Sequence, residues 1–185
     1  MNVYLISDTH FNHANIATYC DRPENFTELI LKRWAETVRP EDLVIHLGDV
    51  ILDKKHAIKD ILDSLPGRKV LVRGNHDRQW SCLRWMEAGF QMACDGFKFR
   101  NSWLTHEPST SLADGCQLNI HGHLHNVWHG FKAECLVGPD ADRLKKELRY
   151  PWQRLFAVEY TDYRPVEFDR FVSHPDKYQS RGPKS

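Results

Sequence analysis

Two pairs of residues with the same spacing could each hold a metal ion. Asp8 and His10 directly follow an apolar run, and His123 and His125 repeat the pattern later in the chain. Side chains two residues apart in extended backbone point to the same face, so both members of a pair can reach one cation. Each pair alone is also consistent with a polar turn, so its weight depends on the residues that follow the other apolar runs.

Three further segments carry metal-binding residue types where apolar runs end. They are Gly48-Asp49, the Gly-Asn-His-Asp sequence of residues 74–77, and His106. Alone, each of the first two segments is more often a turn. Together, five predicted strand ends supply seven side chains with oxygen or nitrogen donors and none with sulfur: Asp8, His10, Asp49, Asn75, His106, His123 and His125. Chance convergence of this set is improbable, so we expect these side chains to lie together.

The elements that must position these residues alternate in the first half of the chain. Apolar runs at residues 3–7, 43–47 and 69–72 predict buried strands, and helical spacing of apolar residues predicts amphipathic helices at 26–38 and 57–65. This alternation favours parallel crossover units, whose ligands gather beyond the carboxyl ends of the strands. The predicted strand ends therefore coincide with the candidate metal ligands.

The second half of the chain changes to closely spaced strands after a predicted helix through residues 83–86. The predicted strands cover residues 97–104, 118–120, 131–137, 155–160 and 165–168. We expect a single domain over residues 1–172 that carries an insertion of unknown role at about residues 138–154. A flexible polar tail is predicted for residues 173–185.

The composition is that of a globular protein and limits the classes of partner. The 185 residues are 41% hydrophobic, and 25 basic residues balance 25 acidic ones. Without net charge the chain lacks a global field to hold a long polyanion, so an extended nucleic acid is a less favoured partner. Five scattered cysteines provide neither a disulfide framework nor a thiolate metal site. The first residues lack the features of a signal peptide or a membrane span, and we expect a cytoplasmic protein without a membrane partner.

The order of the motifs resembles the calcineurin-like metallophosphoesterase superfamily. The signature of that family is Asp-x-His, Gly-Asp, Gly-Asn-His-Asp, His and Gly-His-x-His, and these segments occur in the same order between residues 3 and 126. Residues 7–13 and 163–166 are most similar to the small, single-domain prokaryotic and phage members. The resemblance implies an α/β protein built as a four-layer α/β/β/α sandwich, with a two-metal site between the loops of two sheets.

The resemblance also implies a set of ligands for two divalent metal ions. Asp8, His10 and His125 would hold one ion, Asn75, His106 and His123 the other, and Asp49 would bridge them. Four positive charges meet two negative ones, so the site stays cationic, binds phosphate oxygens and lowers the pKa of a bridging water. The resulting hydroxide would attack phosphorus in line. The mixed donors suit Mn, Fe, Zn, Co or Ni better than Mg or Ca, with manganese weakly favoured.

Further residues are candidates for catalysis and substrate binding. Asp49 would take part in catalysis as the ligand shared by both metal ions. His76 matches the histidine of the family that does not bind metal, which implies that it donates a hydrogen bond or a proton to the phosphate or the leaving oxygen. Asp77 is a candidate to orient that histidine. His13, Arg73 and Asp77 are the candidates for contact with substrate.

The favoured reaction is hydrolysis of a small phosphodiester or phosphomonoester, with nucleotides and cyclic nucleotides among the candidates. A metal-dependent nuclease is the main alternative and would need a basic groove leading to the metals. A protein phosphatase and a catalytically inactive scaffold on the same fold are less favoured. Arg22 and Arg78 could bind a phosphate, although a solvated surface arginine is the commoner outcome. The substrate, the metal and the oligomeric state stay open.

Overall fold

The computed structural model describes residues 1–52, 58–126 and 150–178, and within these residues the strands form two sheets. The first sheet has the order β4-β3-β2-β1-β9, and the second has the order β5-β6-β7-β8. The first comprises β1 (Val3–Ile6), β2 (Leu43–His46), β3 (Arg68–Val72), β4 (Met92–Cys94) and β9 (Val166–Glu167). The second comprises β5 (Phe97–Phe99), β6 (Ser102–Leu104), β7 (Leu118–His121) and β8 (Gln153–Leu155).

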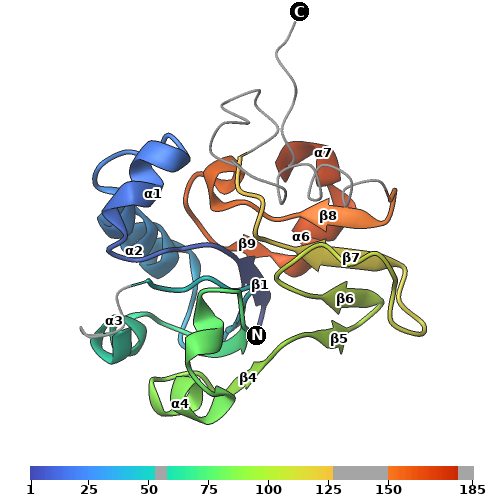
Figure 1. Cartoon of the computed structure of the whole chain (residues 1–185), viewed down its shortest axis with the longest axis horizontal. Coiled ribbons are helices and arrows are strands. Elements are labelled where there is room, and N and C mark those ends of the chain that lie inside the picture. The colour runs from blue at the N-terminus through green and yellow to red at the C-terminus, as the bar shows by residue number, and fades with distance from the viewer. Residues whose placement is uncertain (53–57, 127–149, 179–185) are drawn as a thin grey trace, which may run out of the picture.

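Helices cover the first sheet. Figure 1 shows β1 between the second sheet and a group of four helices, α1 (Ala14–Tyr19), α2 (Phe26–Thr37), α3 (Ile58–Ser64) and α4 (Cys82–Glu87). α2 turns Phe26, Ile30 and Trp34 inward, and this four-residue spacing places one apolar stripe against the core. Two short helices, α6 (Phe168–Ser173) and α7 (Pro175–Tyr178), follow β9, and α6 packs against β1. The predicted α/β fold with two sheets and flanking helices is confirmed.

Parallel pairing brings the motif-bearing strand ends to one place. β1, β2 and β3 are parallel, with Ile6 opposite His46 and His46 opposite Leu71. β6 and β7 are also parallel, with Leu104 opposite Ile120. Parallel strands end at the same edge of a sheet, so each sheet presents its polar loops at one edge. The loop that follows β2 then joins the sheets, because the Leu47 carbonyl lies 2.8 Å from Nδ1 of His106.

Several elements differ from the sequence predictions. Residues 14–19 form α1 although no helix was predicted there, and β4 was also missed. The predicted strand 97–104 is a hairpin, β5 and β6, that turns at Arg100 with φ of 53°. The predicted strand 155–160 ends at Leu155 and continues as a 3-10 helix, η3 (Val158–Thr161). The apolar residues of this segment are buried although they lie outside a strand. A short apolar run indicates burial, and the prediction wrongly took it to indicate a strand.

The C-terminal part of the described chain ends in a short helix. Residues 175–178 form α7, and Tyr178 is buried against Phe171 with ring centroids 5.8 Å apart. The first residues of the predicted tail thus pack on the rest of the chain, and the flexibility expected of residues 173–185 stays a prediction. The predicted strand 131–137 and most of the insertion at 138–154 lie outside the described residues. Among the described helices, each is too short or too polar to cross a membrane.

Candidate metal centre

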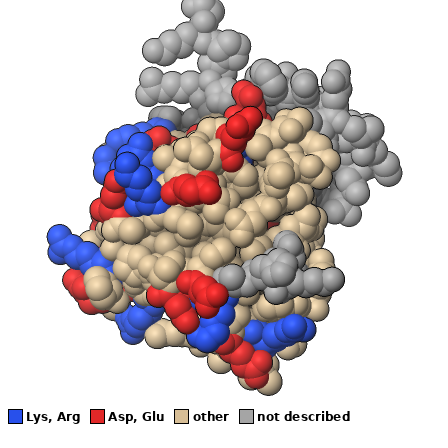
Figure 2. All heavy atoms as spheres, turned by 90° about the vertical axis from the view of Figure 1, so that its left-hand side faces the viewer, with Lys and Arg blue, Asp and Glu red and all other residues tan. Residues whose placement is uncertain are grey.

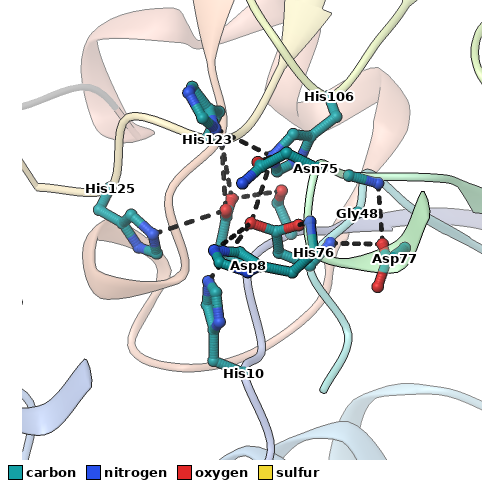
Figure 3. A network of polar contacts seen from close by, with 12 residues as sticks. Asp8, His10, Gly48, Asn75, His76, Asp77, His106, His123 and His125 are labelled. Atoms are coloured by element: carbon teal, nitrogen blue, oxygen red, sulfur yellow. Dashed lines mark hydrogen bonds and ion pairs between the residues drawn. The ribbon is translucent and has the colours of Figure 1, made fainter. Parts of the chain in front are cut away.

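Two groups of ligand-type side chains converge where the strand ends meet. In the first group, ligand atoms of Asp8, His10 and His125 all lie within 4.8 Å of one another. The second group unites Asp49, His106 and His123 within the same limit. Figure 3 shows the labelled members of the two groups gathered around a common centre, from loops that are far apart in sequence: Asp8, His10, His106, His123 and His125. The described residues thus form two adjacent groups, each of which could hold a cation.

Asp49 faces both groups, and Asn75 completes the second one. Oδ2 of Asp49 lies 3.7 Å from Nε2 of His10 and 3.4 Å from Nε2 of His106. Nε2 of His106 is also 3.0 Å from Oδ1 of Asn75 and 3.1 Å from Nδ1 of His123. One carboxylate oxygen thus lies between the two histidine sets, as a bridging ligand would.

The first group contains a buried side chain whose polar atoms have no partner. His10 is 2% exposed, and neither of its ring nitrogens forms a hydrogen bond within the described residues. Burial, followed by the nearby His125, lowers the pKa of His10 well below its ordinary value, so its imidazole is neutral. Buried polar groups in folded proteins are nearly always satisfied. A neutral imidazole with an open lone pair in this position fits a metal ligand.

The second group has a defined proton arrangement. Nδ1 of His106 lies 2.8 Å from the Leu47 carbonyl, which can only accept, so Nδ1 carries a proton. Nε2 is then the atom that faces Asp49, Asn75 and His123. Burial lowers the pKa of His106, but the carboxylates of Asp49 and Asp8 outweigh it and raise the pKa to about 9. A metal ion at this point would replace that second proton.

Strained backbone is concentrated at the same residues. Ten described non-glycine residues have positive φ, and five of them belong to the candidate ligand set: Asp8, His10, Asp49, His123 and His125. Their φ values run from 44° to 72°, a region that side chains with a Cβ visit rarely. Such conformations persist where the surrounding structure enforces them, and they cluster at functional sites.

Glycines allow the motif loops to pack against the aspartates. A Cβ on Gly122 would overlap Oδ2 of Asp8, and a Cβ on Gly74 would overlap Oδ1 of Asp49. The absence of side chains lets the backbone N–H of His123 lie 3.0 Å from Oδ2 of Asp8. The glycine in each motif therefore has a steric reason that the sequence alone could not identify.

Asp77 takes a different role from the one expected. It was a candidate for contact with substrate, but its side chain is fully buried. Its Oδ2 accepts the N–H groups of Asp49 at 2.7 Å and Gly74 at 2.8 Å, and its Oδ1 accepts that of Val50 at 3.1 Å. Asp77 therefore ties two motif loops together through their backbones. Burial and the nearby Asp49 raise the pKa of this carboxyl.

Two histidines that do not belong to the ligand set, His76 and His13, lie beside the centre. The His76 side chain is 40% exposed, and its Nε2 lies 3.9 Å from Oδ2 of Asp49. Its ring centroid is 5.6 Å from that of His10. His13 lies on the other side of His10, with ring centroids 5.8 Å apart. Both positions border the ligand groups without belonging to them.

The arginines weighed from sequence have protein partners. Arg73, a candidate for contact with substrate, donates to both oxygens of Asp95 at 2.7 and 2.9 Å and to the Trp80 carbonyl. Its guanidinium is thus committed to the protein, which argues against the predicted role. Arg78 pairs with Glu107 at 3.3 Å.

Arg22 and Glu159 belong to the surroundings of the centre. The sequence named Arg22 only as a possible phosphate ligand and did not identify Glu159. Arg22 is 5% exposed, which corrects the expectation of a solvated surface residue. It donates to Oε1 of Glu159, which also lies 3.2 Å from Nδ1 of His125. Burial raises the pKa of Glu159, but Arg22 and His125 outweigh this and hold it well below its usual range. The available signal was the position of Glu159 directly after the apolar run 155–158.

The chain belongs to the calcineurin-like phosphoesterase family. The family profile matches residues 1–182. An uncharacterized protein of the archaeon Methanocaldococcus jannaschii is 37% identical over 184 residues, which cover 95% of this chain and 92% of that protein. The gene 66 protein of Mycobacterium phage D29 is 32% identical over 157 residues, which cover 68% of this chain and 79% of the phage protein. The predicted resemblance is confirmed.

A solved structure supports the same assignment. The crystal structure of a protein of unknown function from Aquifex aeolicus superposes with a TM-score of 0.68 at 28% sequence identity. The match covers 93% of this chain and 97% of the other. Family and clustered ligands together identify a metal-dependent phosphoesterase in the general sense.

Proposed function

We propose that this protein is a dinuclear phosphoesterase that hydrolyses a small phosphodiester or phosphomonoester, with nucleotides and cyclic nucleotides among the candidate substrates. Asp8, His10 and His125 would hold one divalent ion, and Asn75, His106 and His123 the other, with Asp49 shared between them. When bound, the ions would bind phosphate oxygens and lower the pKa of water to supply a nucleophile. Manganese is the first ion to test.

The observation that carries this proposal is the unsatisfied, buried His10. Both of its ring nitrogens lack hydrogen-bond partners within the described residues, and one faces the shared Asp49. A purely structural histidine buried in this way would carry the cost of an unpaired polar group, about 1–3 kcal/mol. A bound cation would accept the lone pair of one ring nitrogen of His10 and would neutralise the charge of the carboxylates around it.

His76 would act on the substrate rather than on the metals. Its side chain is the more exposed of those around Asp49, so it can meet a phosphate that approaches from solvent. From there it can donate a hydrogen bond or a proton to the phosphate or to the leaving oxygen. His13, on the other side of His10, is a second candidate for contact with substrate.

The distribution of charge supports a small substrate over an extended nucleic acid. On the face drawn in Figure 2, Lys and Arg side chains lie among Asp and Glu side chains rather than in a continuous basic band. The chain as a whole carries no net charge. Neither observation favours the neutralisation of many consecutive phosphates that nuclease substrates require.

The test is hydrolysis of bis-p-nitrophenyl phosphate and p-nitrophenyl phosphate by metal-free protein refilled with Mn²⁺ or Zn²⁺. We expect turnover that depends on metal, that is lost in Asp49→Ala and that falls about 10²- to 10⁴-fold in His76→Ala. Glu36→Gln, which changes an exposed carboxylate on α2, is the matched control and should keep full activity. Full activity in the absence of metal would overturn the proposed mechanism.

A further inference from the structure

A buried ion pair lies next to His125, on the side away from the metal centre. The side chains of Arg22 and Glu159 are 0% and 5% exposed, and Arg22 Nη2 lies 2.7 Å from Glu159 Oε1. Nε of Arg22 donates to the same oxygen at 2.9 Å. Nδ1 of His125 lies 3.2 Å from both Arg22 Nη2 and Glu159 Oε1. The residues come from distant parts of the chain, since Arg22 precedes α2 and Glu159 lies in η3.

The hydrogen bonds of Arg22 and Glu159 indicate which atom of His125 carries a proton. Nη2 of Arg22 has two hydrogens, and they point to Glu159 Oε1 at 2.7 Å and to the Asp8 carbonyl at 2.8 Å. Both hydrogens of Nη2 are thus engaged at short distances, and Nδ1 of His125, at 3.2 Å, could only share one of them. Glu159 Oε1 is a carboxylate oxygen that only accepts, so its 3.2 Å contact with Nδ1 is a hydrogen bond when Nδ1 carries the proton. The two short bonds of Nη2 and the carboxylate beside Nδ1 together favour the tautomer of a neutral His125 that carries its proton on Nδ1.

This tautomer leaves the lone pair of His125 on the atom that faces the metal centre. Nε2 lies 3.7 Å from Oδ1 of Asp8, within the first ligand group. A carboxylate that accepts the far N–H of a ligand histidine fixes its ring and increases its basicity. Arg22 also donates to the backbone carbonyls of Asp8 and Thr9. It therefore connects Glu159 to the loop that carries Asp8.

Cys20 completes a nearby group that could be mistaken for another cation site. Ligand atoms of Cys20, His125 and Glu159 lie within 4.8 Å of one another. However, the guanidinium of Arg22 contacts the same Glu159 oxygen and lies 3.2 Å from Nδ1 of His125. A fixed positive charge at this position opposes a cation. The group is better explained as support for His125.

We propose that Glu159 and Arg22 are positioning residues for the metal held by Asp8, His10 and His125. Glu159 selects the tautomer of His125 that presents Nε2 as a ligand. Arg22 fixes the position of Glu159 relative to the backbone of Asp8, because it donates hydrogen bonds to both. The proposal rests on the proposed function, because it concerns one of the two metal sites. It predicts that the two sites respond differently when Glu159 is changed.

The tautomer is measurable in the unaltered protein. The Zn²⁺-loaded chain, labelled with ¹⁵N at histidine, would be examined by long-range ¹H–¹⁵N NMR, with His125→Gln used to assign the His125 signals. We expect a protonated Nδ1 and a metal-bound Nε2. A protonated Nε2 in His125 would overturn the proposal, and this measurement does not depend on any Glu159 variant folding.

Titration of Mn²⁺ into metal-free protein by calorimetry tests the energetic effect. In Glu159→Ala we expect one site weakened by about 10- to 100-fold and the other unchanged, with a smaller loss in Glu159→Gln, whose amide oxygen can still accept. Glu36→Gln serves as the control, and circular dichroism verifies folding. Two sites of wild-type affinity in folded Glu159→Ala would overturn this proposal alone. Wild-type protein that binds no metal would overturn the proposed function as well.

Discussion

Asp77 connects two motif loops, and its replacement by asparagine should therefore lower stability even without metal. The carboxylate accepts the N–H groups of Asp49, Gly74 and Val50. An amide can keep the two bonds at one oxygen, but its NH₂ group then faces the N–H of Val50. Bonds to a charged group contribute about 1.5–3 kcal/mol each, and neutral bonds about 1 kcal/mol. Burial raises the pKa of Asp77, which shows that the buried charge is unfavourable. A neutral asparagine avoids this cost, so part of the lost stability is recovered. We expect a net loss of about 2–3 kcal/mol.

Guanidinium unfolding in the presence of EDTA measures this loss, because bound metal would otherwise add its own binding free energy to the native state. The matched control is Asp95→Asn, which changes an exposed carboxylate that pairs with Arg73 at the surface. Exposed pairs contribute less than about 1 kcal/mol. If Asp77→Asn destabilised the chain no more than Asp95→Asn does, the role given to Asp77 would be refuted.

Three other substitutions test separate parts of the structure. Gly122→Ala adds a Cβ that would overlap Asp8, so we expect about 1–3 kcal/mol less stability and weaker Mn²⁺ binding in titrations, and wild-type binding would contradict this. Burial lowers the pKa of His46 to about 3, so the folded imidazole stays neutral while the unfolded chain takes up a proton below about pH 6.5, and stability falls as the pH falls. In His46→Gln, the slope of unfolding free energy between about pH 4 and 6 should decrease by about 1.4 kcal/mol per pH unit, whereas an unchanged slope would disprove this. Arg22→Met leaves the buried Glu159 carboxylate without its arginine and with only the His125 contact, and it should cost about 3–5 kcal/mol in chemical denaturation. A second change, Glu159→Gln, should restore part of this loss, and no recovery would argue against the pairing of Arg22 with Glu159.

The sequence predicted the strands of the first half well because two kinds of signal agree there. Apolar runs mark β1, β2 and β3 within one or two residues, and each run ends in a polar motif. Parallel pairing then places those motifs at one edge, which follows from general rules of α/β architecture. The gathering of the candidate ligands could therefore be expected before any coordinates were known.

The residues that support the ligands could not be found in the same way. Arg22 lies in a polar stretch that resembles surface, and its burial depends on contacts with Glu159, which is 137 positions away. Asp77 looks like a site residue because it follows His76, yet its side chain turns inward to backbone N–H groups. Local pattern identifies residue types at strand ends, whereas the direction of each side chain depends on tertiary packing.

The number of metal ions bound per chain tests the central claim most directly. Metal-free protein would be dialysed against Mn²⁺, and bound manganese would be counted by mass spectrometry alongside Asp49→Asn. If the seven donors form a paired centre, wild-type protein should retain two ions per chain and Asp49→Asn should retain fewer, because Asp49 faces both ligand groups. Wild-type protein that retains no more manganese than Asp49→Asn would contradict the account.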